Sequence, residues 1–264
     1  MNKKQKVKFD KILTDKSSGS SEILYSLNDF LLENINNKNV IDESISLAKK
    51  KLSHFAVIKN YLSDFENLVG HGNIKKIRDF LDQSGKTKDV TTKKIFEKLY
   101  RKIPDANSVF TFSRSGTILN VLRLMKNKNP GLNVIISESR PTFEGRLMAK
   151  ELLKSGLKVK MITDSMTAMF VKSVDAVIIG ADAVLRNQNI VNKSGSLSLA
   201  LICKHYRKPI YVLTAKSKFL NTNNYKLISE DPDKVWKFRH PKLKTVNIPF
   251  EEIDKKLITG IISE

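Results

Sequence analysis

The sequence predicts an α/β protein in which an N-terminal helical bundle is followed by a Rossmann-like domain with a mainly parallel sheet. Two observations lead to this prediction. Apolar residues recur at helical spacing through the first hundred residues, and short β-rich runs alternate with helical segments after Ile103-Pro104-Asp105. We therefore expect a helical domain over residues 1–104 and a Rossmann-like, ligand-binding domain over residues 105–264.

The first domain is expected to contain four helices. The first follows Ser17-Ser18-Gly19-Ser20-Ser21, where a serine can cap the helix, and its apolar positions recur as far as Ile35. The others are expected over residues 45–62, 73–81 and 91–101. A polar link with a glycine, Gln83-Ser84-Gly85-Lys86-Thr87, is expected to separate the last two.

The second domain is expected to alternate strands with helices. Strands are predicted over residues 108–111, 133–137, 158–162, 176–180 and 209–214, and helices over residues 116–126, 143–155 and 196–206. Strands that are apolar on both faces within a βα pattern form parallel sheets covered by helices. Ligands of such sheets bind outside the carboxyl ends of the strands.

The net charge of +20 suggests an affinity for nucleic acid, but the charge is spread along the chain. Residues 1–104 hold 21 Lys and Arg against 13 Asp and Glu, and the rest holds 26 against 14. We find no zinc-finger, KH or aromatic RNA-binding signature and no interleaving of arginine with aromatic residues. We therefore expect that nucleic acid binds only weakly, if at all.

No apolar run approaches the ~20 residues that span a bilayer, and no signal-peptide core follows the Lys-rich start. We expect a cytoplasmic protein without membrane contact. Cys203 follows Leu201-Ile202 and is the only cysteine, which favours a buried, inert thiol. The four histidines, His54, His71, His205 and His240, lie outside the strand-end motifs, and neither a metal site nor a cofactor is predicted.

Three polar clusters follow apolar runs and carry the candidate chemistry. Asp182 ends the run Val177-Ile178-Ile179-Gly180-Ala181, where a carboxylate can accept sugar hydroxyls, move a proton or simply cap a turn. Asn192-Lys193-Ser194-Gly195 is expected to open the helix over residues 196–206, so that its N–H groups and Lys193 favour an anion. An ordinary helix cap with a solvated lysine is the alternative.

The third cluster, Glu138-Ser139-Arg140-Pro141, supplies a second cation. Arg140 can bind a phosphate through two N–H groups, or it can pair with Glu138 or Glu144. We expect neither Arg140 nor Lys193 to belong to the core.

The order and spacing of residues 135–145, 180–183 and 192–195 resemble a known family. It unites the alpha, beta and delta subunits of initiation factor 2B with methylthioribose-1-phosphate isomerase and ribose-1,5-bisphosphate isomerase. The resemblance covers roughly residues 109–264. It implies that Asp182, Asn192 and Lys193 contact a ligand and that Arg140 and Glu144 line the pocket edge. It also implies that residues 247–264 are the closing segment, which helps to form a dimer.

Two departures from the isomerases decide the functional expectation. The resemblance implies a cysteine in the isomerases where this chain has Ser113, usually after a histidine where it has Phe112. A serine hydroxyl carries a proton less readily than a thiol of pKa ~8.5. The isomerases also carry an Arg-Gly-Ala type loop where this chain has Ser18-Gly19-Ser20, so the glycine is kept and the charge is not.

We therefore expect a regulatory protein related to initiation factor 2B, which binds a phosphorylated small molecule, a sugar phosphate or nucleotide, without evident catalysis. The resemblance implies a homodimer or higher oligomer and a translation initiation factor partner. The alternative is an aldose-ketose isomerase of a phosphorylated ribose, with Asp182 as the acid or base. Nonspecific nucleic-acid binding rests on charge alone. The candidate ligand-binding residues are Gly19, Ser113, Arg140, Glu144, Asp182, Asn192 and Lys193.

Overall fold

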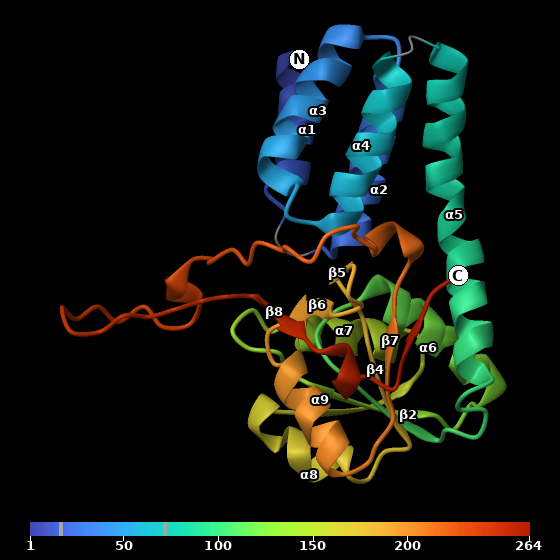
Figure 1. Cartoon of the computed structure of the whole chain (residues 1–264), viewed down its shortest axis with the longest axis vertical. Coiled ribbons are helices and arrows are strands. Elements are labelled where there is room, and N and C mark those ends of the chain that lie inside the picture. The colour runs from blue at the N-terminus through green and yellow to red at the C-terminus, as the bar shows by residue number, and fades with distance from the viewer. Residues whose placement is uncertain (16–17, 71–72) are drawn as a thin grey trace. The chain divides into compact units, whose positions relative to one another are not determined.

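The computed structural model describes residues 1–15, 18–70 and 73–264 (Figure 1). Ser17 and His71, which enter the sequence analysis, lie outside the described residues. The chain divides into two compact units. The helical unit comprises residues 1–91 and 217–219, and the α/β unit comprises residues 92–216 and 220–264. The domain boundary at residue 104 stays a prediction.

The helical unit is built on amphipathic helices that share one apolar core. Its helices are α1 Lys3–Leu13, α2 Ser20–Glu33, α3 Lys38–Leu52, α4 Ala56–Gly70 and most of α5 Ile74–Tyr100. Large side chains from four of them, including Phe9, Phe30, Leu62, Phe65 and Leu81, are fully buried or nearly so. Within the described residues, no helix is both long enough and apolar enough to cross a membrane.

Helix α1 was not predicted from the sequence. Asn2 caps this helix by accepting a hydrogen bond from the Gln5 N–H, while the Gln5 side chain accepts one from the Asn2 N–H. Only the second half of α1 is apolar, and its buried residues are Phe9, Ile12 and Leu13. The lysines of its first turn therefore concealed an amphipathic helix.

Two further helix predictions are wrong. The helix expected over residues 45–62 is two helices, because a turn at Ser53–Phe55 lets α4 pack back against α3. The link expected at residues 83–87 is helical, and α5 runs through it without interruption. Ser84 Oγ donates to the Phe80 carbonyl one turn earlier, as it does in a regular helix. Glycine in a helix costs about 1 kcal/mol relative to alanine, and α5 contains Gly85 despite this cost.

The α/β unit contains the predicted parallel sheet. Its strands are β1 Ser108–Thr111, β2 Asn133–Ser137, β3 Lys158–Ile162, β4 Ala176–Ile179, β7 Ile210–Leu213 and β9 Gly260–Ile262. They lie in the order β3-β2-β1-β4-β7-β9, and every neighbouring pair is parallel. The predicted α/β fold is therefore confirmed, and β9, which the sequence analysis missed, forms one edge.

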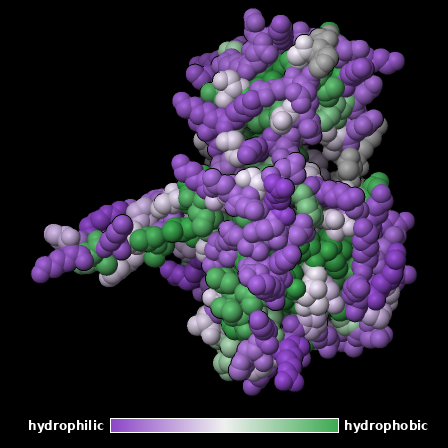
Figure 2. Space-filling view, viewed as in Figure 1, coloured by the Kyte–Doolittle hydropathy of each residue, from purple (hydrophilic) through white to green (hydrophobic). Residues whose placement is uncertain are grey.

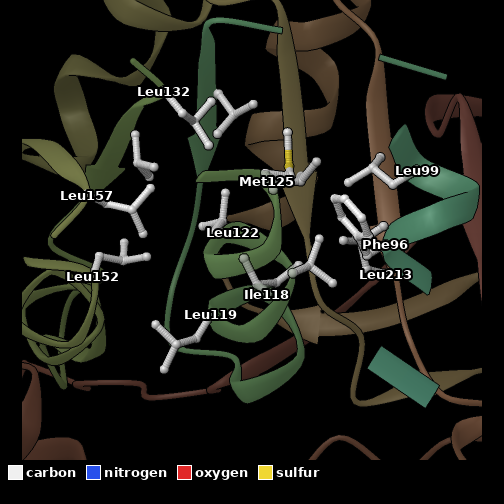
Figure 3. Close-up of a cluster of buried hydrophobic side chains, with 14 of the residues drawn as sticks. Phe96, Leu99, Ile118, Leu119, Leu122, Met125, Leu132, Leu152, Leu157 and Leu213 are labelled. Atoms are coloured by element: carbon white, nitrogen blue, oxygen red, sulfur yellow. The ribbon is translucent and has the colours of Figure 1, made fainter. Parts of the chain in front are cut away.

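Helices cover both faces of this sheet. One face packs against α6 Gly116–Lys128, α7 Glu144–Lys154 and the last turns of α5, in a core that includes Leu99, Leu122, Met125 and Leu152 (Figure 3). The helices α8 Thr167–Val171 and α9 Ser196–His205 contact each other and cover the other face (Figure 1). Cys203 of α9 is buried, and burial raises the pKa of its thiol to about 12. The predicted burial of this thiol is thus confirmed.

A second, three-stranded antiparallel sheet is absent from the sequence prediction. It consists of β5 Ala183–Val184, β6 Ile190–Lys193 and β8 Phe250–Ile253, in the order β5-β6-β8. Asn192 and Lys193 are the last two residues of β6, and α9 begins only at Ser196. The prediction that Asn192 and Lys193 open the helix is therefore wrong. The β-branched pair Ile190-Val191 favours the strand.

Replacing Gly145 by alanine tests how closely α7 lies against β2. A Cβ atom there would lie 1.8 Å from the Ser137 carbonyl oxygen, so the helix must shift. We expect Gly145→Ala to destabilise the α/β unit by about 3 kcal/mol in urea denaturation. Gly85→Ala is the control, because its Cβ would lie 3.8 Å from the nearest atom. It should stabilise the protein by about 0.5–1 kcal/mol. Equal stability of the two variants would refute this close packing.

Candidate functional site

The candidate site lies where the order of the parallel sheet reverses. From β1 the chain builds outward through β2 and β3, and it then returns to β4 on the other side of β1. Doubly wound sheets bind ligands at the carboxyl ends of the two strands beside such a point. Ser113 follows β1 and Asp182 follows β4. A Cβ atom at Gly180 would lie 3.0 Å from Ser115 Oγ, so glycine permits the close approach of the two loops.

Three of the predicted site residues form one hydrogen-bonded network. Ser113 Oγ donates to Glu144 Oε2 at 2.6 Å, and Lys193 Nζ donates to Glu144 Oε1 at 2.7 Å. Thr142 Oγ1 donates to the same oxygen at 3.0 Å. The Glu144 carboxylate therefore connects the loop after β1, the first residue of α7 and the last residue of β6.

The charges in this network compensate each other. Burial alone would raise the pKa of Glu144, but the Lys193 charge and the hydrogen bonds from Lys193, Ser113 and Thr142 outweigh it and lower the pKa. Lys193 is only 7% exposed, and its ammonium lies 5.5 Å from the ring centre of Phe250. The expectation that Lys193 lies outside the core is thus wrong. Lys193 is a buried cation with its counter-ion in place.

The backbone around Ser113 is held in an uncommon conformation. Ser113 and Ser139, each two residues beyond the end of a strand, have φ angles of 61° and 59°. The Ser113 N–H donates to Ser139 Oγ at 2.9 Å. Asp164 in turn accepts from the N–H groups of Ser139 and Arg140 at 2.8 and 2.7 Å. Such conformations persist only where the surrounding structure enforces them, and they are frequent at functional sites.

The sequence predicted that the start of α9 is open to an anion, and this prediction is wrong. Glu251 Oε1 accepts from the N–H groups of Gly195 and Leu197, both at 2.7 Å, so a carboxylate of the protein already caps this end. Asn192 is buried just before it and donates from Nδ2 to Ser196 Oγ at 2.9 Å. The phosphate-binding role given to Asn192 and Lys193 must therefore come from their side chains.

Asp182 lies beside the same strand. Its N–H donates to the Val191 carbonyl at 2.8 Å, directly before Asn192. Asp182 is half-buried, and together with burial its charge raises the pKa of Tyr225. The side chains of Asp182 and Tyr225 therefore lie within electrostatic reach of each other.

Two predicted residues contact other groups. Arg140 is exposed, and its guanidinium lies 5.0 Å from the ring centre of Phe143. The pairing with Glu138 that was considered for Arg140 is made by Arg146 instead, at 2.6 Å. Gly19 belongs to the helical unit, where it is the N-cap of α2 and its N–H donates to Glu22. The ligand-binding roles of all seven candidates stay predictions.

Thr142, Asp164 and Glu251 were not among the predicted site residues. Asp164 could have been found, because it follows the predicted strand over residues 158–162 by two positions, as a strand-end carboxylate. Glu251 lies in the segment compared with the family's closing segment, but its caps on α9 depend on β8 pairing with β6, which the sequence did not predict.

Comparison with known proteins gives a match over nearly the whole chain. A family model described as the initiation factor 2 subunit family matches residues 9–264. Methylthioribose-1-phosphate isomerase of Bacillus pumilus is 37% identical over 61% of this chain and 49% of its own length. A translation initiation factor eIF-2B subunit 2-like protein of Pyrococcus horikoshii is 32% identical over 61% of this chain and 58% of its own length.

The ribose 1,5-bisphosphate isomerase of Archaeoglobus fulgidus is also similar, with 32% identity over 55% of this chain and 45% of its own. The matched region thus spans about half the length of these relatives. Among solved structures, the translation initiation factor eIF-2B of Pyrococcus horikoshii has a TM-score of 0.85 at 22% identity, covering 100% of this chain and 96% of its own. A chain of the tetrameric eIF2B-beta2-delta2 complex of C. thermophilum has a TM-score of 0.81 at 15% identity, covering 100% and 91%. These likenesses establish the fold.

The lowered pKa of Glu144 predicts how stability changes with pH. A carboxylate whose folded pKa lies below its ordinary value of about 4.3 stabilises the protein above that value, and this stabilisation is lost as pH falls through the folded pKa. We expect the stability difference between the parent and Glu144→Gln to shrink as pH is lowered from about 6 to about 3 in urea denaturation. Glu138→Gln is the control, because Glu138 pairs with the exposed Arg146. A difference that does not change with pH would contradict the Glu144 network.

Lys193 and Arg140 should differ sharply in their effect on the unliganded protein. Lys193→Ala leaves Glu144 half-buried without its counter-ion, which costs about 3 kcal/mol and lowers Tm by about 6–10 °C. Arg140→Ala removes an exposed cation–π contact of about 0.5 kcal/mol and should leave Tm within about 2 °C. Differential scanning calorimetry checks both values. Similar melting temperatures would show that the ion pair contributes little.

Proposed function

Because the chain belongs to the initiation factor 2 subunit family, we propose that it is a regulatory, ligand-binding member of that family. It binds a phosphorylated small molecule, a sugar phosphate or nucleotide, at the carboxyl edge of the parallel sheet. It does not convert that ligand at the rate of an enzyme. The same proposal makes it a cytoplasmic homodimer or higher oligomer that contacts a translation initiation factor.

The observation that carries this proposal is the state of Ser113. Its hydroxyl donates to Glu144, whose other oxygen accepts from Lys193. A carboxylate with a lowered pKa is a weak base, so it does not activate a serine hydroxyl for proton transfer near neutral pH. The network therefore favours binding over turnover.

The same network indicates how a ligand would bind. Carboxylates such as Glu144 and Asp182 accept hydrogen bonds from sugar hydroxyls, and Lys193 can hold a phosphate as a point charge. Because Lys193 already pairs with Glu144, an anionic ligand competes with that carboxylate. The expected ligand thus combines hydroxyl donors for the carboxylates with a phosphate for the buried ammonium.

The second candidate function is isomerisation of a phosphorylated ribose. A carboxylate at the carboxyl edge of the sheet favours it, because half-buried Asp182 follows β4 and its N–H donates to the Val191 carbonyl directly before Asn192. Two of the three relatives described above are named as isomerases, methylthioribose-1-phosphate isomerase and ribose 1,5-bisphosphate isomerase. In this reading Asp182 is the acid or base.

A thermal-shift screen of pentose phosphates and nucleotides tests the binding proposal. A ligand at 100 times its Kd should stabilise the parent by about 2.7 kcal/mol. Arg140→Ala is the cleanest variant, because its unliganded stability should not change, and it should weaken binding about tenfold if Arg140 holds the phosphate. Lys150→Ala serves as the control, because it removes an exposed cation that lies in α7 and is not a candidate site residue. Equal shifts in all three proteins would remove Arg140 from the site.

A turnover assay separates the two candidate functions. Purified protein is incubated with ribose 1,5-bisphosphate or methylthioribose-1-phosphate, and the reaction is followed by NMR over hours. We expect no ketose product from either compound. Product that disappears in Asp182→Asn would replace the binding proposal by the isomerase.

A further inference from the structure

Five connections of the α/β unit lead from the end of a helix to the start of a parallel strand. Strands β1, β2, β3, β4 and β7 begin at the same edge of the sheet, because they run parallel to one another. This edge lies opposite the carboxyl edge of the candidate site, at the lower end of the unit with α8 and the end of α9 (Figure 1). We call it the amino edge. Its connections are residues 101–107, 129–132, 155–157, 172–175 and 206–209.

Hydrogen bonds join the connections on one side of β1. Lys126 Nζ, near the end of α6, donates to the Ser155 carbonyl after α7 at 2.9 Å. Asn129, directly after α6, donates from Nδ2 to Asn107 Oδ1 at 2.8 Å and to the Ala106 carbonyl at 3.2 Å. The connections that lead into β1, β2 and β3 therefore form one continuous surface.

Asp175 extends this surface to the other side of β1. Its Oδ2 accepts from the N–H groups of Asn107 and Ser108 at 2.9 and 2.8 Å, and from Ser108 Oγ at 2.9 Å. Burial would raise the pKa of Asp175, but these hydrogen bonds and the charge of Lys208, which follows α9, lower it. All five connections thus lie within contact or electrostatic reach of their neighbours.

Exposed cations dominate the amino edge. Each lies in a connection or within two residues of one, and none makes an ion pair or a side-chain hydrogen bond with the residues that the structure describes. The acidic residues of the five connections are Asp105 and Asp175, and the Asp175 carboxylate already binds backbone donors. Hydrophilic side chains, drawn purple, project from this end of the unit in Figure 2. The exposed cations are Arg101, Lys102, Lys128, Lys154, Lys158, Lys172, Lys204 and Arg207.

The sequence does not reveal this concentration of charge. An even spread of cations along the chain was the reason to expect only weak binding of nucleic acid. An alternating βα fold returns the chain to the same edge after every helix, so cations that recur at helix ends gather in space. The α/β unit holds 30 Lys and Arg against 15 Asp and Glu, and the helical unit holds 17 against 12. Most of the excess charge therefore belongs to the α/β unit.

Helix dipoles explain part of this pattern. A cation in the last turn of a helix stabilises the negative end of the dipole, which accounts for cations such as Lys128 and Lys154. The effect falls off beyond the last turn. Lys102 and Arg207, however, lie two residues beyond a helix, and Lys158 lies in β3. Because like charges repel, these additional cations are unfavourable for the unit alone and favour a polyanionic partner.

We propose that the amino edge binds the phosphate backbone of a nucleic-acid duplex. This site is separate from the ligand pocket of the proposed function and does not depend on it. Nucleic-acid interfaces are polar and strongly basic, whereas protein interfaces have an apolar centre and few lysines. Six of the eight exposed cations are lysines, and Tyr206 is the only exposed large hydrophobic side chain among the described residues of the connections. This composition favours phosphates over an acidic protein.

A duplex suits this edge better than a single strand. Proteins bind single strands with successive aromatic side chains on which the bases stack. At the amino edge, the ring of Tyr206 instead meets that of His205 edge-on, with ring centres 4.8 Å apart. The run Trp236-Lys237-Phe238-Arg239-His240 does alternate rings with cations, contrary to the sequence analysis, but it lies outside the amino edge. The amino edge therefore offers charge without a stacking surface.

The length of the amino edge sets how many phosphates it can hold. Five strands spaced by about 4.8 Å span about 20 Å from β3 to β7. A duplex carries one charge per ~1.7 Å of its axis, so about 12 phosphates lie along that length and about half of them face the protein. The exposed cations can therefore neutralise about five phosphates. The logarithm of the binding constant should then fall with the logarithm of the salt concentration with a slope of about −4 to −5.

The test measures the binding of fluorescent duplexes of about 20 base pairs, one of RNA and one of DNA, by anisotropy between about 50 and 200 mM salt. Arg101→Gln/Lys102→Gln and Lys204→Gln/Arg207→Gln each remove two cations, from connections far apart in the sequence. Each double variant should weaken the binding of both duplexes about 60-fold at about 100 mM salt and bring the slope closer to zero by about 2. The side chains are exposed and unpaired among the described residues, so Tm should not change.

Lys50→Gln/Lys51→Gln is the matched control. These two lysines are also neighbours at the end of a helix, exposed and unpaired among the described residues, but they belong to α3 of the helical unit. The control removes the same charge, so it separates a defined surface from the net charge of +20. It should bind both duplexes within about threefold of the parent, because salt screens distant charges.

The outcomes decide between a duplex and the other partners. Selective loss of binding in both edge variants supports the proposal, and a tighter complex with the RNA duplex than with the DNA duplex narrows the ligand to A-form RNA. A control that loses as much affinity as the edge variants, or a parent slope shallower than about −2, overturns it. Oligouridine that binds more tightly than either duplex also overturns it.

An acidic protein is tested with polyglutamate. Polyglutamate that binds the parent more tightly than either duplex, and does not bind the edge variants, overturns the proposal and assigns the amino edge to an acidic protein. A failed screen of sugar phosphates and nucleotides bears only on the proposed function, because the two sites lie at opposite edges of the sheet.

Discussion

The Glu144 carboxylate is the constraint on which the candidate site depends. It accepts hydrogen bonds from three side chains that belong to different parts of the chain: Ser113, Thr142 and Lys193. Each of these contacts involves an ionised acceptor and is therefore stronger than a neutral hydrogen bond. One charged group thus fixes the loop after β1, the start of α7 and the end of β6 relative to one another. It also makes the buried Lys193 tolerable, because an isolated ammonium would have to lose its proton or reach water.

The sequence predicted the parallel sheet well because its signal is local. Each strand of β1, β2 and β3 is a short apolar or β-branched run between polar turns, and their predicted bounds agree with the structure. The first hundred residues were correctly predicted to be helical, but the number of helices was wrong. A glycine and several polar residues imitate a loop at Gly85, while the turn at Ser53 lies inside an uninterrupted helical pattern. Packing of α4 back against α3 accompanies the turn at Ser53, and no local window contains that information.

The sequence predicted several residues of the candidate site but not the hydrogen bonds between them. Strand-end placement selected Ser113, Glu144 and Lys193, which the structure joins in one network. The sequence could not reveal that Lys193 is buried and paired, because its strand belongs to a sheet completed by β8, about 60 residues later. The same long-range pairing brings Glu251 to the start of α9. Its carboxylate accepts from N–H groups that the sequence predicted would bind a ligand. Antiparallel contacts between distant segments are the information that composition and spacing lack.

The left-handed backbone at Ser113 has an evolutionary consequence. Its φ is 61°, and the hydrogen bond from its own N–H to Ser139 does not depend on the side chain at position 113. Serine and cysteine have nearly the same shape, so the exchange of oxygen for sulfur at this position leaves the backbone support intact. A thiolate there would nevertheless face the ionised Glu144, and like charges at that distance raise the pKa of the thiol. The charge at position 144 therefore governs how readily a thiol at position 113 would lose its proton.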